Sequence, residues 1–268
     1  MHKKGCLIVF EGIEGSGKTT ASVNLQKYLT SRGYKAKWTR EPTRSKIGML
    51  IEDILTGQMA VAEEAIPLLF AADRADHTKR IIMPWIKRGY IVIGDRYLHS
   101  SLAYQKSGME KAFNPDWLKK INKYALDPNL IIFLDISPEE GLSRIGKGQR
   151  IQDDKFFEDL EAQKKIREAY HELLDLNKPS YSLLQRDLIS GNSHPIFKES
   201  SLDKKTTVLS IDASLDREKV QNMINEQVQS FLKSKGIEKQ TERSLENASL
   251  TSSFENSDES REEDEEAN

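Results

Sequence analysis

The 268-residue sequence contains one cysteine, Cys6, and no apolar run that approaches the roughly 20 residues needed to span a bilayer. A single cysteine excludes an internal disulfide, and no cluster of cysteine and histidine indicates a zinc site. The sequence near the N-terminus also lacks the long apolar stretch of a secretory signal. We therefore expect a cytoplasmic protein without a membrane partner, in which Cys6 is a small buried side chain of a strand.

The sequence carries little net charge, −2 with histidine neutral, and this value neither favours nor excludes a nucleic-acid partner. The charge is uneven, because residues 236–268 hold 11 acidic and 3 basic side chains, which leaves the rest of the chain mildly basic. A basic body concentrates phosphates, although the same balance is common in unrelated proteins.

Residues 236–268 are rich in glutamate, serine and asparagine and contain one aromatic residue, Phe254. Such a segment buries too little apolar surface to offset the entropy that ordering costs. We therefore predict a folded domain over residues 1–235 and a disordered acidic tail over residues 236–268.

Five short segments have the composition of β-strands and alternate with helical patterns. The predicted strands are Cys6–Phe10, Lys35–Thr39, Tyr90–Asp95, Leu130–Ile136 and Thr207–Asp212. Three of them contain continuous apolar runs, which are typical of parallel strands covered on both faces. The predicted helices are Thr19–Ser31, Lys46–Leu55, Glu63–Lys87, Asp116–Tyr124, Pro138–Ile145, Asp154–Leu176 and Asp216–Lys235. This alternation predicts an α/β fold, a five-stranded parallel sheet with helices on both faces.

Two segments interrupt the alternation. Residues 143–155 carry Arg144, Lys147 and Arg150 around two glycines, and form a short basic stretch between two helices. Residues 183–205 are polar and rich in serine, and we predict a surface insertion there.

A glycine-rich segment lies between the first predicted strand and the first predicted helix. It reads Gly12-Ile-Glu-Gly-Ser-Gly-Lys-Thr19 and matches G-x-x-x-x-G-K-[ST] at every fixed position. In such a P-loop, backbone N–H groups face one anion and the helix adds its positive N-terminal end. We expect Lys18, on a surface loop, to contact the β- and γ-phosphates, and the Thr19 hydroxyl to bind Mg²⁺.

A chance glycine-rich turn is the alternative, but the flanking strand and helix favour a nucleotide site. The motif alone does not indicate a kinase. The residues expected to bind ATP are Gly12, Ile13, Glu14, Gly15, Ser16, Gly17, Lys18, Thr19 and Thr20.

The third predicted strand ends in Asp95 and Arg96. A carboxylate at the carboxyl end of a strand beside the P-loop strand is placed to organise Mg²⁺. The planar guanidinium of Arg96 can bind a phosphate through two hydrogen bonds. A surface ion pair is the alternative, and the nearby P-loop favours the site.

Four blocks of the sequence together resemble the thymidylate kinase family. They are Phe10-Glu-Gly-Ile-Glu-Gly-Ser-Gly-Lys-Thr-Thr20, Thr39-Arg-Glu-Pro42, Leu69-Phe-Ala-Ala-Asp-Arg74 and Asp95-Arg-Tyr-Leu-His-Ser-Ser-Leu-Ala-Tyr-Gln105. Many families share the first block, whereas the other three are far more selective. The resemblance implies one P-loop kinase domain with a short lid at residues 143–155. It also implies transfer of the γ-phosphoryl group of ATP to dTMP, with Mg²⁺.

The resemblance further implies roles for single residues at the phosphate and the metal. Arg40 and Arg96 would hold the phosphate of dTMP. Glu14 would lie near the sugar 3′-OH and the metal, and Asp95 would organise Mg²⁺.

At the base and the sugar, the resemblance implies that Phe70 stacks on thymine and that Arg74 hydrogen-bonds the edge of the base. Ser101 and Gln105 would read the base further. Tyr104 would press against the sugar where a 2′-OH would project, and so favour deoxyribose.

Each of these roles has a structural alternative. Phe70 lies on a helical stretch where an aromatic side chain is usually core, and Tyr104 could be a packing tyrosine. Arg74 and Asp73 could form a solvated pair with Lys79. Four histidines lack the spacing of metal ligands and are expected at solvated positions: His77, His99, His171 and His194.

In some thymidylate kinases the P-loop carries an arginine just after its acidic residue, and here that position is Gly15. The resemblance then implies that the lid supplies the cation for the transferring group, from Arg144 or Arg150 with Lys147 third. A solvated basic loop is the alternative, and the chain after Arg150 is a few residues longer than the family pattern. The expected catalytic residues are Lys18, Asp95, Arg96, Arg144 and Arg150.

Two other functions stay open. One is a different nucleotide or deoxynucleoside kinase on the same scaffold, acting on dUMP or dCMP. The other is a P-loop ATPase or GTPase, although the sequence has no Asn-Lys-x-Asp motif. The expected partners are dTMP and ATP, with no nucleic-acid polymer and a possible homodimer.

Overall fold

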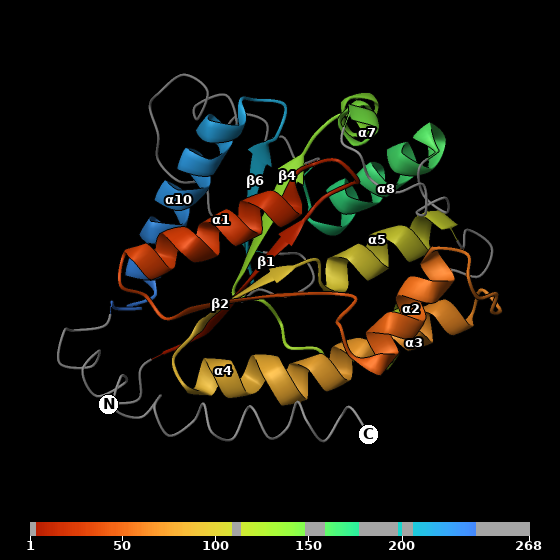
Figure 1. Cartoon of the computed structure of the whole chain (residues 1–268), viewed down its shortest axis with the longest axis horizontal. Coiled ribbons are helices and arrows are strands. Elements are labelled where there is room, and N and C mark those ends of the chain that lie inside the picture. Colours follow the sequence, from red (N-terminus) through yellow and green to blue (C-terminus); the bar gives the residue numbers. More distant parts are fainter. Residues whose placement is uncertain (1–3, 109–113, 148–158, 177–197, 200–205, 240–268) are drawn as a thin grey trace.

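The computed structural model describes residues 4–108, 114–147, 159–176, 198–199 and 206–239. In this part of the chain, helices cover both faces of a central β-sheet (Figure 1). The strands are β1 (Cys6–Glu11), β2 (Ala36–Arg40), β3 (Ile91–Asp95), β4 (Leu130–Asp135), β5 (Lys198–Glu199) and β6 (Thr207–Asp212). The helices are α1 (Lys18–Ser31), α2 (Lys46–Leu55), α3 (Ala65–His77), the π-helix η1 (Thr78–Ile82), α4 (Met83–Lys87), α5 (Leu98–Gly108), α6 (Pro115–Ile121), α7 (Pro138–Lys147), α8 (Leu160–Leu173) and α10 (Arg217–Ser234).

Five of the described strands are parallel, in the order β2-β3-β1-β4-β6, which confirms the predicted sheet. The two-residue strand β5 adds an antiparallel edge beside β6 that was not predicted. The register pairs Phe10 with Asp95, and Asp95 with Arg40. Since the strands run parallel, their carboxyl ends lie at one edge of the sheet, where the P-loop also begins.

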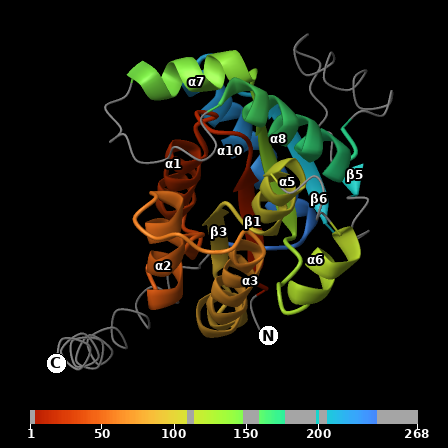
Figure 2. The same cartoon turned by 90° about the vertical axis from the view of Figure 1, so that its right-hand side faces the viewer.

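The core surrounds the central strands. Strands β1 and β3 are buried along their whole length, as continuous apolar runs predict for strands covered on both faces. Cys6 is buried in β1, also as predicted. Helices α1 and α10 pack against each other on one face, and α5 packs against α8 on the other (Figure 2).

The helices differ from the predictions at several places. The predicted helix Glu63–Lys87 is a continuous stretch of α3, η1 and α4 that begins at Ala65. Helix α5 was not predicted at all. Helix α7 continues to Lys147, so the segment predicted as a lid begins inside a helix.

Several predicted features lie wholly or partly outside the described residues. They are residues 148–155 of the lid, most of the insertion at 183–205, and residues 240–268 of the acidic tail. The division of the chain into a kinase domain and a tail therefore stays a prediction. Among the helices that the structure describes, none combines the length and the apolar character that crossing a membrane requires.

Candidate active site

The P-loop, residues 12–19, connects the carboxyl end of β1 to the start of α1. The N-cap of α1 is Gly17, whose φ of 92° favours glycine and whose missing side chain leaves the helix without a side-chain cap. The first N–H groups of a helix need partners from outside the helix. Those of α1 are therefore available to an anion such as a phosphate.

Lys18 folds back over the P-loop. Its Nζ atom donates to the carbonyl oxygen of Ile13 (2.7 Å) and to Oγ of Ser16 (3.3 Å). The side chain is only 5% exposed, so the expectation of a surface position is wrong. Burial, together with the positive charge of Arg96, lowers the pKa of Lys18 to about 8. A bound phosphate would stabilise the charged form of this amine.

Thr19 and Asp95 meet at the edge of the sheet. The Thr19 hydroxyl donates to Oδ2 of Asp95 (2.6 Å). Oδ1 of Asp95 is buried and has no hydrogen-bond partner among the described residues. Such an oxygen is costly unless a ligand satisfies it, and Mg²⁺ prefers oxygen ligands and commonly shares them with substrate phosphates. The hydroxyl and the carboxylate therefore fit a Mg²⁺ ion held together with a nucleotide.

Arg96 has a left-handed backbone, with φ of 65°, which is unfavourable for a residue with a Cβ atom. Its guanidinium forms an ion pair with Glu14 of the P-loop and donates to the hydroxyl of Tyr104 (3.2 Å). The Tyr104 hydroxyl in turn donates to Glu14 (2.9 Å). Although burial opposes the charge, Glu14 raises the pKa of Arg96 further above its ordinary value, so Arg96 stays cationic.

Arg74 lies on α3 and is 1% exposed. It donates to Glu41 (2.9 Å), to Asn122 (2.5 Å) and to Oγ of Ser101 (2.7 Å). Asp73 is also buried, where it accepts hydrogen bonds from Thr43, so the alternative of a solvated Arg74–Asp73 pair is wrong.

Helices α3 and α5 contact each other, and Arg74 of α3 bonds to Ser101 of α5. Phe70 precedes Arg74 by one turn of α3, and Gln105 follows Ser101 by one turn of α5. Phe70 is half-buried and is not part of the buried core, which disfavours the core alternative. Gln105 is buried, and its Oε1 atom has no partner among the described residues. The ring of Phe70 and the Oε1 atom of Gln105 are therefore both available to contact a ligand.

Arg40 ends β2, at the level of Asp95. Its guanidinium donates to Glu52 of α2 (2.5 Å), and 42% of the side chain is exposed. Exposed pairs of this kind contribute little stability. An incoming phosphate can therefore compete with Glu52 for Arg40.

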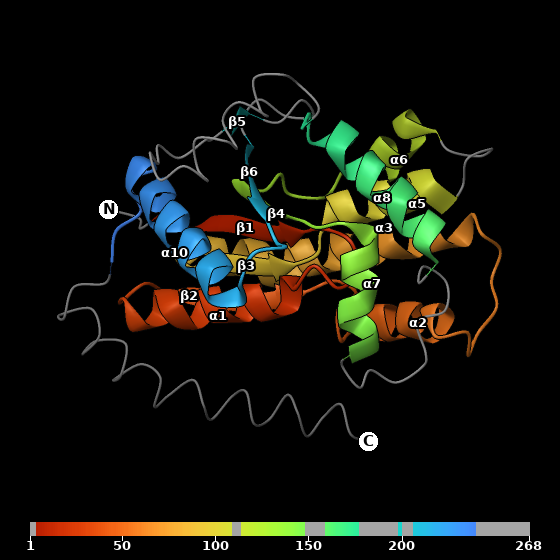
Figure 3. The ribbon, with the colours of Figure 1, turned by 90° about the horizontal axis from the view of Figure 1, so that it is seen from above.

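Helix α7 lies close to the P-loop end of α1 (Figure 3). A Cβ atom at Gly15 would lie 2.0 Å from the carbonyl oxygen of Gly141, so no other side chain fits there. Arg144, one turn further along α7, donates to Glu140 (2.8 Å). Arg150, the other predicted lid arginine, lies outside the described residues.

The sequence predicted no role for Glu11, although this residue lies inside the first of the four blocks that resemble the family. This carboxylate is fully buried and accepts hydrogen bonds from the Tyr97 N–H and from the hydroxyls of Ser100 and Tyr170. A charged residue directly after a buried apolar run is a signal that could have identified it. Gln163 of α8 was also missed, and its Oε1 atom accepts from the N–H of Glu14 (3.1 Å).

The expectation that the histidines are solvated is wrong for two of them. His77 is buried and hydrogen-bonds to Glu41 (3.0 Å) and to Thr39 (2.6 Å). His99 is also buried, and burial together with the charge of Arg74 lowers its pKa to about 4, which keeps it neutral.

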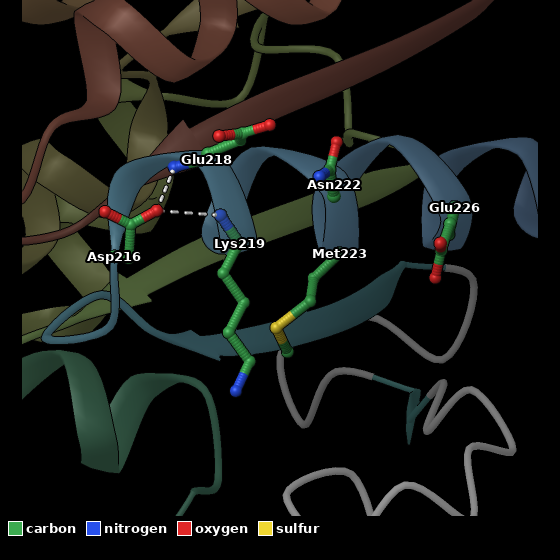
Figure 4. A pocket seen from close by; sticks show the side chains of 6 residues that line it. All are labelled: Asp216, Glu218, Lys219, Asn222, Met223 and Glu226. Carbon is green, nitrogen blue, oxygen red and sulfur yellow. Dashed lines mark hydrogen bonds between the residues drawn. The ribbon is translucent and has the colours of Figure 1, made fainter.

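A hollow beside α10 is an alternative location for a ligand (Figure 4). Its lining residues are Asp216, Glu218, Lys219, Asn222, Met223 and Glu226. Asp216 is already used, because it accepts from the backbone N–H groups of Glu218 (2.9 Å) and Lys219 (3.3 Å) at the start of the helix. Three carboxylates and one lysine disfavour a phosphate at this hollow.

Comparison with known proteins agrees with this geometry. The model of the family described as thymidylate kinase matches residues 10–187. A probable thymidylate kinase of Pyrococcus horikoshii is 41% identical over 179 residues, which cover 65% of this chain and 84% of the relative. Its namesake in Thermococcus gammatolerans is 38% identical over 212 residues, which cover 70% of this chain and 99% of the relative. The chain therefore belongs to the thymidylate kinase family.

Proposed function

We propose that the protein transfers the γ-phosphoryl group of ATP to the 5′-phosphate of dTMP, which yields ADP and dTDP. The observation that best supports this proposal is that Asp95 and Arg96, which are adjacent in the chain, connect two sets of contacts. Asp95 contacts Thr19 at the P-loop, and Arg96 contacts Tyr104 of α5 in addition to Glu14 of the P-loop. A phosphoryl donor and a phosphate acceptor can thus bind on either side of one strand end.

On the donor side, the P-loop backbone and the start of α1 bind the phosphates of ATP. Lys18 exchanges its hydrogen bonds to Ile13 and Ser16 for contacts to the phosphates. Thr19 and Asp95 hold Mg²⁺, which neutralises phosphate charge when bound. Support for this assignment comes from the unpartnered Oδ1 atom of Asp95.

On the acceptor side, Phe70 stacks on the base while α3 and α5 supply polar groups to its edge. A guanidinium has five N–H donors, and Arg74 uses four of them on Glu41, Asn122, Ser101 and the Tyr97 carbonyl oxygen. The remaining donor suits the O4 acceptor of thymine. Oε1 of Gln105 is an acceptor that suits the N3–H of thymine. Cytosine carries the opposite groups at both positions and is therefore disfavoured.

At the sugar and the phosphate, Arg96 and Arg40 bind the phosphate of dTMP. The Tyr104 ring, held by Glu14 and Arg96, occupies the space of a ribose 2′-OH. Glu14 approaches the 3′-OH.

In the chemical step, an oxygen of the dTMP phosphate forms a bond to the γ-phosphorus of ATP as the bond from that phosphorus to the β–γ bridging oxygen breaks. The attacking oxygen is already ionised at neutral pH, so no general base is needed. The protein positions the two groups and balances their charge. Lys18 and Arg96 do so from fixed elements, and Arg144 and Arg150 do so from the lid.

A coupled ADP-release assay across dTMP, dUMP, dCMP, dGMP, UMP and CMP tests this function. We expect the highest kcat/KM for dTMP, and a margin over dUMP of about 10- to 200-fold, because the two differ by one methyl group. A higher value for dCMP or dUMP identifies the other kinase. ATP turnover that does not rise with any monophosphate contradicts a nucleotide kinase. The homodimer and the cytoplasmic location stay predictions.

A further inference from the structure

The carboxylate of Glu11 is the junction of three elements behind the active site. Oε1 accepts from the backbone N–H of Tyr97 (3.1 Å), just after β3. Oε2 accepts from Oγ of Ser100 on α5 (2.5 Å) and from the hydroxyl of Tyr170 on α8 (3.0 Å). Glu11 itself is 0% exposed, so water contributes nothing to its solvation.

A buried carboxylate is an expensive way to hold a fold together. Burial raises the pKa of Glu11, while the hydrogen bonds from Ser100 and Tyr170 and the charge of Arg96 oppose this rise. A neutral side chain of similar size would avoid the cost of burying a charge. The retained carboxyl group therefore calls for a function that depends on what Glu11 contacts.

One set of these contacts fixes the backbone of Arg96. The left-handed conformation of Arg96 persists only if its neighbours hold it. The N–H of Arg96 donates to the carbonyl oxygen of Phe10 (3.0 Å), and the N–H of Tyr97 donates to Glu11. Both acceptors belong to β1, so consecutive residues of one strand hold the peptide groups on both sides of Arg96.

A second set of contacts orients the guanidinium. The Ser100 hydroxyl donates to Oε2 of Glu11 and also lies 2.8 Å from the Tyr170 hydroxyl, and its oxygen can still accept a hydrogen bond. Nη1 of Arg96 donates to that oxygen (3.4 Å) and to the Tyr104 hydroxyl (3.2 Å). Glu11, together with Tyr170, thus holds the Ser100 hydroxyl in place, and the hydroxyl provides one contact of the guanidinium.

We propose that Glu11 is a positioning residue for the transfer reaction, which holds Arg96 in the orientation that binds the acceptor phosphate. It acts through the Tyr97 N–H and the Ser100 hydroxyl. The inference rests on the proposed function, because Arg96 is the phosphate-binding residue there. The bond to Tyr170 extends this support to α8, the helix that follows the lid in the chain.

The variant Glu11→Gln tests the inference, because an amide keeps the size of the side chain but replaces one of the two acceptor oxygens with an NH₂ donor. The matched control is Thr206→Val, which removes a buried hydroxyl bonded to the Pro128 carbonyl oxygen (2.8 Å). Thr206 directly precedes β6, at the amino end of that strand, whereas the candidate site lies at the carboxyl ends of the strands. We expect Glu11→Gln to raise the KM for dTMP about tenfold or more, with the KM for ATP within about threefold. Thr206→Val should change neither KM.

A double-mutant cycle with Arg96→Lys separates positioning from general support of the fold. Lysine keeps the charge but loses the planar fork. If Glu11 acts through Arg96, the double variant loses no more kcat/KM for dTMP than Arg96→Lys alone, because coupled residues are not additive. The inference is overturned if the losses of kcat/KM in the two single variants multiply in the double variant. It is also overturned if Glu11→Gln raises the KM for dTMP and the KM for ATP equally.

Two further measurements separate a failure of the role of Glu11 from a folding failure of the variant and from a failure of the proposed function. If Glu11→Gln does not fold, Ser100→Ala interrupts the same path to Arg96 and should raise the KM for dTMP selectively; unchanged kinetics of Ser100→Ala then overturn the inference. If the wild-type protein phosphorylates dTMP but the losses of kcat/KM in the two single variants multiply in the double variant, the role of Glu11 is contradicted and the proposed function is not. A wild-type protein without any dTMP turnover contradicts the proposed function itself, and the role of Glu11 with it.

Discussion

Gly15 of the P-loop and Gly141 of α7 meet backbone to backbone. A Cβ atom on Gly141 would lie 2.5 Å from the carbonyl oxygen of Glu14, and one on Gly15 would lie 2.0 Å from that of Gly141. Real Cβ atoms essentially never approach this closely. The first turns of helix α7, which leads into the predicted lid, therefore pack directly against the loop proposed to bind ATP.

Gly141→Ala should for this reason disturb the P-loop, even though alanine is a better helix former than glycine. We expect kcat to fall about tenfold and the KM for ATP to rise, measured by steady-state kinetics. Ser143→Ala, at an exposed position of the same helix, is the control and should behave as wild type. Normal kinetics of Gly141→Ala would mean that α7 and the P-loop separate easily.

The affinity for ATP should fall as the pH rises through about 8. The pKa of Lys18 is lowered to about 8 in the free protein, mainly by burial, and bound phosphates raise it. Below that pH the amine is already charged, whereas above it each binding event must take up a proton. Kd for ATP measured by calorimetry from pH 7 to 9.5 should therefore stay level and then increase, by at most tenfold per pH unit. Lys18→Ala should bind weakly without this rise and should nearly abolish turnover.

Phe70→Ala should raise the KM for dTMP and leave the KM for ATP nearly unchanged. Stacking of an aromatic side chain on a base is worth about 1–3 kcal/mol in other nucleotide-binding proteins. Leu68, exposed on the same helix, offers the matched control Leu68→Ala. A large loss of thermal stability with unchanged dTMP affinity would restore the core interpretation of Phe70.

Tyr104 allows its ring and its hydroxyl to be tested separately. Tyr104→Ala removes the ring and should narrow the preference for dTMP over its ribose analogue. Tyr104→Phe keeps the ring but loses the hydroxyl that contacts Glu14 and Arg96, so the sugar preference should persist while the KM for dTMP rises. A deoxy-to-ribo ratio that is constant in both variants excludes Tyr104 as the sugar gate.

The lid arginines should affect turnover more than binding. Arg144→Ala or Arg150→Ala should reduce kcat more than about tenfold with the KM for dTMP within about threefold, because the contact forms mainly in the transition state. Lys164→Ala, on the surface of α8, is a control for the loss of one positive charge. Wild-type kcat in both single variants and in the double variant would place the catalytic cation elsewhere.

Much of the fold could be predicted because its signals are local. Apolar runs such as Leu7–Val9 are continuous only where both faces of a strand are buried, and the P-loop is defined by adjacent residues. Helix α5 escaped prediction because it buries polar side chains, among them Ser100 and Ser101. Their partners, Glu11 and Arg74, come from elsewhere in the chain, so no local pattern marks that helix as buried.

The same reason explains why single side chains were misplaced. Lysine is almost never fully buried without a partner and histidine is buried only in part of its occurrences, and the partners are supplied by the fold. Lys18 is buried by the curl of the loop, and His77 by a contact with Glu41, 36 residues away. The family motifs named the candidate residues of the site, but only the assembled structure shows which of them already have partners, as Arg40 has in Glu52.

The buried thiol of Cys6 gives the protein an internal reporter of global opening. Burial raises its pKa to about 12, so in the folded state it is neither ionised nor accessible to an alkylating reagent. It lies at the start of β1, between β3 and β4 in the middle of the sheet. Because the chain has no other cysteine, the rate of thiol modification reports how often the central strand is released. The same rate, followed with and without ATP and dTMP, measures how far each nucleotide stabilises the whole fold rather than its own pocket.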